Sequence, residues 1–301
     1  MGRPVSLSPA TTAAAMEEAL AASAPLARRL AGELCHVDPG HGRSCAWYHG
    51  FWQYLRWFDF VTTPRDHADF YRMGLAPSLA RGDRRILISG TADYEMPAQV
   101  LAICRDAGLV PEITVLDICR TPLRLCEWHA ERAGARIATV AADIRSYRPA
   151  EAFDLLCTHS FFGRFSPEER PGLLARWHDL LRPGGRVVTV NRIRGGAPDT
   201  VRFTTEQAER FVARVKQAAD AVEKQLDVPV DTIMAMAAAY IGAKRTHPVR
   251  SLDDLVGLFE GAGFRMEQVA VGTIGARARR APRGPTMSGG AEYARIVAER
   301  L

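Results

Sequence analysis

Short apolar runs alternate with segments of helical periodicity from residue 84 onward. Five of these runs predict β-strands, over residues 84–90, 112–117, 136–143, 153–160 and 186–193. Strands that alternate with amphipathic helices are typical of βαβ units, which build a mostly parallel sheet. Two further strands are expected over residues 264–274 and 292–301, joined by a Gly- and Arg-rich loop as an antiparallel hairpin. The pattern therefore predicts an α/β fold with a seven-stranded, mostly parallel sheet and helices on both faces.

Two helical regions lie outside this alternation. Residues 11–35 form an Ala-rich segment with leucines near helical spacing, and residues 203–244 predict two helices broken at Pro229. We expect an N-terminal helical cap over residues 1–80 and an α/β domain over residues 81–301. The domain carries a helical insertion, residues 203–250, that is expected to lie over the site.

Aromatic side chains are concentrated between Trp47 and Tyr71. Such a cluster is expected to form the core of the cap, and its ring faces can also hold a cation by cation–π attraction. Tyr48, Trp52 and Tyr54 are therefore candidates, Tyr48 for a catalytic role and the other two for substrate binding. Both interpretations of the cluster stay open.

The ends of the first two predicted strands carry residues suited to a nucleoside. In an open α/β sheet, ligands bind outside the carboxyl ends of the strands. The small residues Ser89, Gly90 and Thr91 allow backbone amides to approach a ligand closely. An ionised carboxylate at Asp117 can accept both hydroxyls of a ribose, with Ile118 beside it. The alternative is that Asp117 only caps the following helix.

The next two strand ends extend the same edge. Asp143 is suited to bind the exocyclic amine of adenine while Ile144 covers the ring. Thr158 and His159 end the fourth strand and are expected to face the other half of the crevice. His159 is a candidate general base, with a hydrogen-bonded structural histidine as the alternative. Ser160 is a candidate for substrate binding.

Polar residues also end the fifth strand. Asn191 is a candidate catalytic residue, and Arg192 is a candidate for binding a polar or carboxylate-bearing substrate.

Several segments together resemble the class I S-adenosylmethionine-dependent methyltransferase family, which has a Rossmann-like fold. The resemblance covers roughly residues 80–301 and rests on ILISGTA, VLDICRTPLRLCEWHAE, AADI, FDLLCTHSFF and LLRPGGRVVTVNR. It implies S-adenosylmethionine as co-substrate, with its ribose on Asp117 and its methionine part near Gly90. The first segment departs from the family pattern at Ile88, Ala92 and Tyr94. A nicotinamide-binding Rossmann domain is disfavoured, because GTADYEM lacks the G-x-G-x-x-G spacing.

Three functions follow from this resemblance. The first is methyl transfer to an oxygen, nitrogen or carbon of a small, biosynthetic metabolite. The second is attack on the aminocarboxypropyl chain of the same co-substrate, including cyclisation to azetidine-2-carboxylate with release of methylthioadenosine. The altered first segment motivates this second function. The third is a non-catalytic binding subunit.

Composition limits the partners. The 39 basic residues face 34 acidic ones without extended basic blocks, so no nucleic-acid partner is expected. Arginine far outnumbers lysine, as in Arg-rich bacterial proteomes. No leader and no apolar run long enough for a membrane span are recognised. A small-molecule substrate is expected, and a homodimer stays open.

The cysteines point to a reducing, cytoplasmic compartment. The six thiols occur at no disulfide-like spacing. Cys35, His36, His41, Cys45 and His49 fall within 15 residues of one another, but their spacing fits no usual zinc pattern. We expect an ordinary loop there and no metal.

Overall fold

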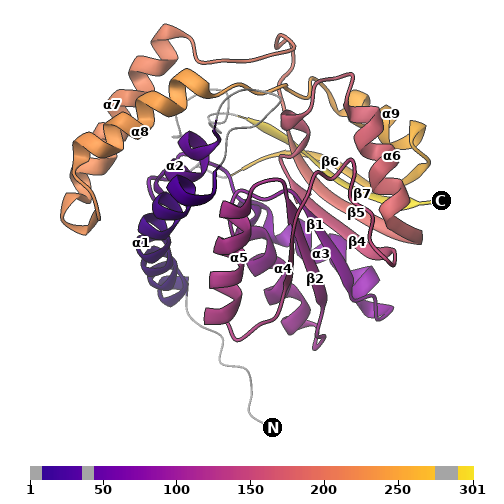
Figure 1. Cartoon of the computed structure of the whole chain (residues 1–301). Helices are drawn as coiled ribbons and strands as arrows, with labels where there is room; N and C mark the ends of the chain where they lie inside the picture. The colour runs from indigo at the N-terminus through magenta and orange to yellow at the C-terminus, as the bar shows by residue number, and fades with distance from the viewer. Residues whose placement is uncertain (1–8, 36–43, 275–290) are drawn as a thin grey trace.

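The computed structural model describes residues 9–35, 44–274 and 291–301. A single seven-stranded sheet runs through the molecule in the order β3-β2-β1-β4-β5-β7-β6 (Figure 1). The strands are β1 (Arg85–Ser89), β2 (Glu112–Asp117), β3 (Ala138–Ala141), β4 (Phe153–His159), β5 (Leu181–Ile193), β6 (Phe264–Thr273) and β7 (Glu292–Arg300). Strands β1 to β5 pair in parallel, whereas β7 pairs antiparallel with both β5 and β6. The predicted fold and terminal hairpin are confirmed; the loop between β6 and β7 lies outside the described residues.

The strand order reverses between β1 and β4. From β1 the chain proceeds to β2 and then β3 in one direction, and it returns to place β4 on the other side of β1. Such a reversal opens a crevice at the carboxyl ends of the two central strands.

Alternating side chains of the strands pack into two separate cores, one on each face of the sheet. Ile86 and Ile88 of β1 pack on the face that α3, α4 and α5 cover, whereas Leu87 packs on the face of α6 and α9 (Figure 1). Period-two alternation in a strand sends neighbours to opposite faces, so the three central residues of β1 are all apolar because both faces are covered. The helices are α3 (Ala68–Ala80), α4 (Glu95–Asp106), α5 (Arg120–Arg132), α6 (Arg170–Leu180) and α9 (Leu252–Gly261).

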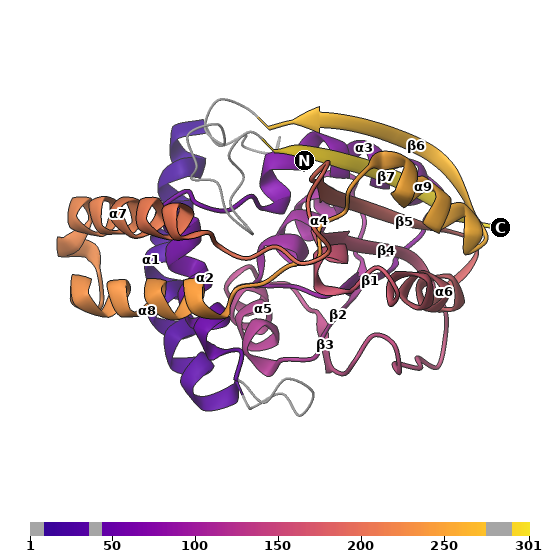
Figure 2. The same cartoon turned by 90° about the horizontal axis from the view of Figure 1, so that it is seen from above.

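A third core holds the cap together. Aromatic residues of α2 pack against residues of the insertion helices α7 and α8, which lie beside α1 and α2 in Figure 2. Phe51 and Tyr54 of α2 and Phe211 and Tyr240 of the insertion are fully buried there. The bounds are α1 (Pro9–Leu34), α2 (Ala46–Trp57), α7 (Thr205–Ala221) and α8 (Val230–Ala243). The N-terminal helices and the insertion therefore form one cap, and the predicted break at Pro229 is the N-cap of α8.

Helix α3 lies on the sheet, although residues 1–80 were expected to form the cap. At Gly74 the helix approaches β5 and β7 so closely that a Cβ would stand 2.9 Å from Val188 Cγ1. Tyr71 and Leu75, on the same helix, are fully buried in the core beneath the sheet. The cap in the structure thus comprises α1 and α2 with the insertion, and α3 belongs to the sheet layer.

Strand β5 begins earlier than the strand expected over residues 186–193. Helix α6 ends at Leu180, and β5 begins at Leu181, which pairs with Phe153 of β4. The Pro-Gly-Gly segment therefore lies within β5, where Gly184 has φ +73°. Among the described residues, no helix is both long enough and apolar enough to cross a membrane.

Candidate functional site

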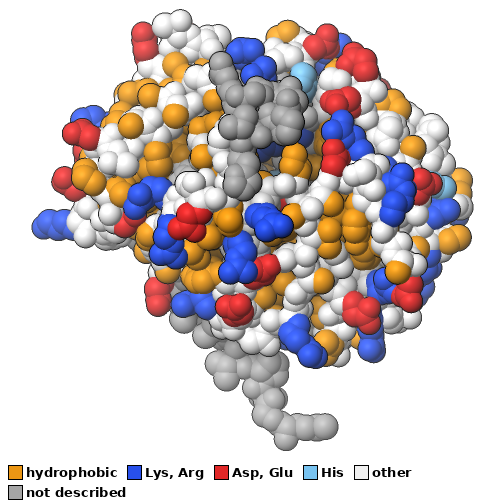
Figure 3. Space-filling model, in the orientation of Figure 1, with side chains coloured by type: hydrophobic (Ala, Val, Ile, Leu, Met, Phe, Trp, Pro, Cys, Tyr) orange, Lys and Arg blue, Asp and Glu red, His pale blue; other side chains and the backbone are white. Residues whose placement is uncertain are grey.

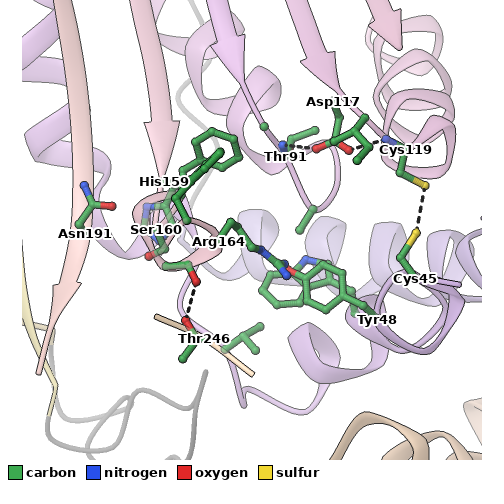
Figure 4. Close-up of a pocket in the computed structure, with 18 of the residues that line it drawn as sticks. Cys45, Tyr48, Thr91, Asp117, Cys119, His159, Ser160, Arg164, Asn191 and Thr246 are labelled. Carbon is green, nitrogen blue, oxygen red and sulfur yellow. Dashed lines mark hydrogen bonds between the residues drawn. The ribbon is translucent and has the colours of Figure 1, made fainter. Parts of the chain in front are cut away.

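A cavity of about 560 Å³ opens at the carboxyl ends of the central strands, between the sheet and the cap (Figure 4). One wall carries the loops after β1, β2 and β3, and the opposite wall carries the segments after β4 and β5. Helix α2 and the end of α8 close it from the cap side. This size is typical of a pocket for a small molecule.

Asp117 occupies the end of β2 and faces the cavity. Its Oδ2 accepts a hydrogen bond from the Thr91 amide at 3.1 Å, and its Oδ1 accepts one from the Cys119 amide at 2.8 Å. A carboxylate has about four acceptor positions, so two remain for ligand hydroxyls. Burial under the cap raises the pKa of this carboxyl. Burial disfavours the ionised form of this carboxylate, so hydroxyl donors from a ribose would stabilise its charge.

Asp143 lies further out on the same wall. Arg145 Nη2 donates to its Oδ2 at 2.7 Å, and the Arg145 amide donates to its Oδ1 at 2.9 Å. The guanidinium holds the pKa of Asp143 below its usual range. Ile144 is buried, whereas Ile118 is 68% exposed although it lines the cavity. Ile118 is therefore the better placed of the two to cover a flat ring.

Ser89 and Thr158 were expected to contact the co-substrate, and the structure places both inside the sheet. The Thr158 hydroxyl donates to the Ser89 carbonyl at 2.8 Å, and Trp177 Nε1 donates to the Ser89 hydroxyl at 3.2 Å. Neither residue lines the cavity. They join β1 to β4 and α6, and the Thr158 carbonyl also accepts a hydrogen bond from the Tyr71 hydroxyl beside His159.

Gly90 begins the turn after β1 and needs to be glycine. Its φ is +74°, and a Cβ at this position would lie 2.1 Å from the ring of Phe161. A side chain at Gly90 would thus meet both an unfavourable backbone conformation and a direct clash. The backbone here is open to the cavity, as the resemblance requires for the methionine part of the co-substrate.

The departure of this turn from the family pattern has a structural reason. Asp93 accepts hydrogen bonds from Trp52 Nε1 at 2.7 Å and from Arg56 Nη1 at 2.8 Å, so that it fastens α2 of the cap. Arg56 also pairs with Glu95, and its guanidinium lies 5.1 Å from the centre of the Tyr94 ring. Where the family carries further glycines, this chain carries the residues to which its cap binds.

A group of cations extends from Arg164, which interacts with Asp117 and Tyr48, through Lys244 to Arg194 after β5. The Arg164 guanidinium lies 4.3 Å from the centre of the Tyr48 ring, and Lys244 Nζ lies 5.0 Å from it (Figure 4). Lys244 is 3% exposed, and burial together with the charges of Arg164 and Arg194 lowers its pKa well below the ordinary value. Burial and the charge of Arg192 lower the pKa of Arg194 to about 9. An anion placed here would relieve the repulsion among these groups.

His159 stands beside this group with a defined tautomer. The Tyr71 hydroxyl donates its proton to the Thr158 carbonyl at 2.9 Å, so it can only accept from His159 Nδ1, which lies 3.1 Å away. Nδ1 therefore carries the proton and Nε2 has a lone pair. This buried Nε2 has no hydrogen-bond partner among the described residues. Desolvation and the neighbouring His67 lower the pKa of His159, so the ring is neutral.

The remaining predicted residues divide between cavity and core. Ser160, in the left-handed region at φ +51°, Arg192 and Trp52 line the cavity. Asn191 also lines it, but its Oδ1 accepts from the Phe162 amide at 3.4 Å and its Nδ2 donates to Thr189 at 3.0 Å. Tyr54 is fully buried away from the cavity, and its hydroxyl donates to Asp227. Tyr54 thus belongs to the core of the cap.

Three of the cations in the cavity were not foreseen from the sequence. Arg164, Arg194 and Lys244 follow β4, β5 and α8 respectively. The available signal was weak: Lys244 is one of three lysines in the chain and stands at the end of the insertion.

The cysteines and histidines near residue 40 do not form an ordinary loop throughout. Cys35, Cys45 and His49 come together with Cys119, which was not connected with them in the sequence. His36 and His41 lie outside the described residues.

Known proteins resemble parts of this chain. A family model described as "Methyltransferase domain" matches residues 98–185. A probable thiol methyltransferase of Arabidopsis thaliana is 36% identical over 63 residues, which are 20% of this chain and 28% of that protein. A thiocyanate methyltransferase of the same plant is 37% identical over 51 residues, 17% of this chain and 22% of that protein. The chain therefore spans less than a third of the length of either relative.

Two solved structures that are similar to this chain are also methyltransferases. Magnesium protoporphyrin IX methyltransferase from Synechocystis PCC 6803, solved with S-adenosylhomocysteine, has a TM-score of 0.45 at 9% identity and covers 78% of this chain and 84% of its own. The N-methyltransferase NodS from Bradyrhizobium japonicum has a TM-score of 0.46 at 12% identity and covers 79% of this chain and 86% of its own.

Proposed function

Because residues 98–185 match a methyltransferase domain, we propose that this protein transfers the methyl group of S-adenosylmethionine to a small anionic metabolite. The observation that carries the proposal is that one cavity holds both a carboxylate with free acceptor positions and a group of cations. Asp117 offers two acceptor positions, and the cations extend from Arg164 beside it through Lys244 to Arg194 after β5. A zwitterionic adenosyl compound and an anionic acceptor together match this distribution of charge.

At the adenosyl end, each group has an assigned role in the proposal. Asp117 accepts the ribose hydroxyls, and Ile118 covers the adenine while Asp143 accepts from its amine. The turn at Gly90 gives the methionine part close access to the backbone. These contacts fix the direction of the sulfonium, and methyl transfer depends chiefly on such positioning of two reactants.

At the acceptor end, the cations hold an acidic group of the substrate, a carboxylate above all. Arginine suits this function because its planar fork binds a carboxylate through two parallel hydrogen bonds. Arg192 and Arg194 lie at the end of β5, and Lys244 faces them from the insertion. The substrate thereby bridges sheet and cap.

His159 Nε2 is the proposed general base. Its lone pair accepts the proton of a hydroxyl or amine of the acceptor as the acceptor atom bonds to the methyl carbon and the carbon–sulfur bond breaks. The products are the methylated acceptor and S-adenosylhomocysteine, with the proton on the imidazole. Tyr71 orients the ring through Nδ1. Asn191, whose amide is bound within the protein at both ends, is proposed to position the segment at Phe162 rather than to react.

Product analysis tests this proposal. The purified chain is incubated with S-adenosylmethionine and a library of small carboxylate-bearing metabolites, and adenosyl products are separated by mass spectrometry. We expect S-adenosylhomocysteine only with an anionic acceptor. His159→Gln should lower kcat roughly 10²- to 10⁴-fold with little change in co-substrate affinity. His178→Gln, a substitution on α6 outside the cavity, is the control. An unchanged kcat in His159→Gln would remove the base from the mechanism.

A second candidate is attack on the aminocarboxypropyl chain. It is favoured by the altered turn after β1, where Trp52, Asp93 and Glu95 surround the region expected to hold the methionine part. An acidic and aromatic surrounding suits the ammonium group of that chain. Methylthioadenosine formed without any acceptor would support this reaction and contradict methyl transfer. Absence of any adenosyl binding in calorimetry would contradict both and favour a non-catalytic subunit.

A further inference from the structure

Three thiols and an imidazole meet at one point between the cap and the sheet. Cys35 Sγ lies 3.4 Å from His49 Nδ1 and 3.6 Å from Cys119 Sγ, and Cys45 Sγ lies 3.6 Å from Cys119 Sγ. The four ligand atoms all lie within 4.8 Å of one another. The four residues are named the Cys₃His cluster below.

We infer that the Cys₃His cluster binds one structural zinc ion. Zinc prefers four tetrahedral ligands, with Zn–S near 2.3 Å and Zn–N near 2.0–2.1 Å. A tetrahedron with those bond lengths separates two sulfur atoms by about 3.8 Å and sulfur from nitrogen by about 3.6 Å. The three distances in the cluster are close to these values. Three sulfurs with one imidazole nitrogen are also a usual ligand set for structural zinc.

The four ligands do not come from a single loop. Cys35 directly follows α1, Cys45 is the N-cap of α2, and His49 stands one helical turn later on the same face. Cys119 comes from the other domain, where it is the N-cap of α5 after β2. Folding therefore brings three separate segments to one point, although thiols offer only weak hydrogen bonds in return.

A disulfide explains the arrangement less well. A disulfide would join two sulfurs at about 2.05 Å and leave the third thiol and the imidazole without a function. Cys119 lies equally far from Cys35 and Cys45, at 3.6 Å from each, which favours neither pair. Thr121 Oγ1 also lies 3.1 Å from Cys35 Sγ, while its hydroxyl donates to the Leu30 carbonyl at 3.3 Å.

The zinc would stabilise the adenosyl end of the cavity. Four protein ligands leave no open position, so the ion has a structural rather than a catalytic role. The Cys119 amide donates to Asp117 Oδ1 at 2.8 Å, and a zinc-bound Cys119 would fix this donor. Cys45, His49 and Cys119 also line the cavity (Figure 4). Removal of the ion is therefore expected to loosen both the cap and the Asp117 loop.

Elemental analysis of the full chain tests the inference. The chain is purified without a metal-binding tag and analysed by inductively coupled plasma mass spectrometry, and one zinc per chain is expected. After reduction and chelation, titration with Co²⁺ should give the ligand-field and thiolate charge-transfer bands of tetrahedral cobalt, saturating at one equivalent. Cys119→Ala and Cys45→Ala should lose the metal. Cys104→Ala, a buried thiol of α4 outside the cluster, should keep it.

Specific results would overturn the inference. They are reduced, folded protein that takes up neither zinc nor cobalt, a Cys119 disulfide found by mass spectrometry after alkylation, or a Cys119→Ala variant that holds as much metal as Cys104→Ala. The cobalt titration uses the unchanged chain, so it decides the question even if a variant fails to fold. All these readouts are independent of methyl transfer.

Discussion

The two ends of the cavity are built in opposite ways. The adenosyl end uses residues that stand directly after β2 and β3, and its principal side chain, Asp117, is acidic. The acceptor end collects cations from segments after β4, β5 and α8, far apart in the sequence. The first end is a property of the sheet, whereas the second exists only when the insertion folds against it.

The surface shows no such polarity. On the face seen in Figure 3, basic and acidic side chains are interspersed. The concentration of cations inside the cavity is therefore local, and it supports an anionic small molecule rather than an extended polyanion. Under the proposed function, the difference between the two ends means that the fold would supply the co-substrate site and the cap the specificity.

The largest expected effect on ligand binding is at Asp117. Asp117→Asn removes the charge that would accept two ribose hydroxyls, and hydrogen bonds to a charged group contribute about 1.5–3 kcal/mol. We expect the affinity for S-adenosylhomocysteine to fall roughly 10- to 100-fold in isothermal titration calorimetry. Asp143→Asn is the matched control on the same wall and should cost only a few-fold, because Asp143 is paired with Arg145. Equal losses would mean that the adenosyl end has no single principal contact.

Low pH is expected to destabilise the acceptor end first. Desolvation lowers the pKa of His67 to about 3, against 6.5 in the unfolded chain. Below pH 6.5 the imidazole is therefore protonated in the unfolded state but not in the folded state. The free energy of unfolding falls as the pH falls. At pH 5 this amounts to about 2 kcal/mol for His67. The lowered pKa of His159 acts in the same direction.

Urea unfolding at pH 7 and pH 5 measures this loss. His67→Gln should remove the part of the loss that comes from His67, about 2 kcal/mol at pH 5, and leave the part that comes from His159. His178→Gln, at a partly exposed position, should leave most of the loss in place. A pH dependence that His67→Gln does not change would show that the acceptor end does not control acid stability.

The smallest expected effect has the opposite sign. Lys244→Met keeps the length of the side chain and removes a buried cation from beside Arg164 and Arg194. The protein without substrate should become more stable by about 1 kcal/mol, seen as a higher Tm in calorimetry, while turnover of an anionic acceptor falls. Lys224→Met, on the insertion but outside the cavity, is the control. A lower Tm would show that Lys244 is satisfied by the protein alone.

The sheet could be predicted closely from the sequence because its signals are local. Short apolar runs, and Gly90 and Asp117 at strand ends, are properties of a few consecutive residues. The predicted start of β5 was wrong because the pairing of Leu181 with Phe153, on another strand, decides it. The placement of α3 depends likewise on contacts of Gly74 with β5 and β7, which lie more than 100 residues away.

The aromatic residues of the cap could be identified from the sequence, but the sequence did not show which of them face the cavity. Tyr48, Trp52 and Tyr54 all belong to one aromatic helix, and helical periodicity places Tyr54 on another side from the first two. Which side faces the cavity depends on α7 and α8, so the sequence alone could not separate Tyr54 from the others. Cys119 was missed as a partner of Cys45 for the same reason, because the two are 74 residues apart.

The position of β7 between β5 and β6 determines the stage of folding at which the pocket is completed. β6 has no partner in the described sheet other than β7, although it precedes β7 in the chain. β6 therefore stays unpaired until β7 has been synthesised. Tyr293 of β7 also lines the cavity, so the pocket itself is unfinished until then. Assembly of the pocket is thus a late event in folding, and it depends on contacts between distant segments that form slowly.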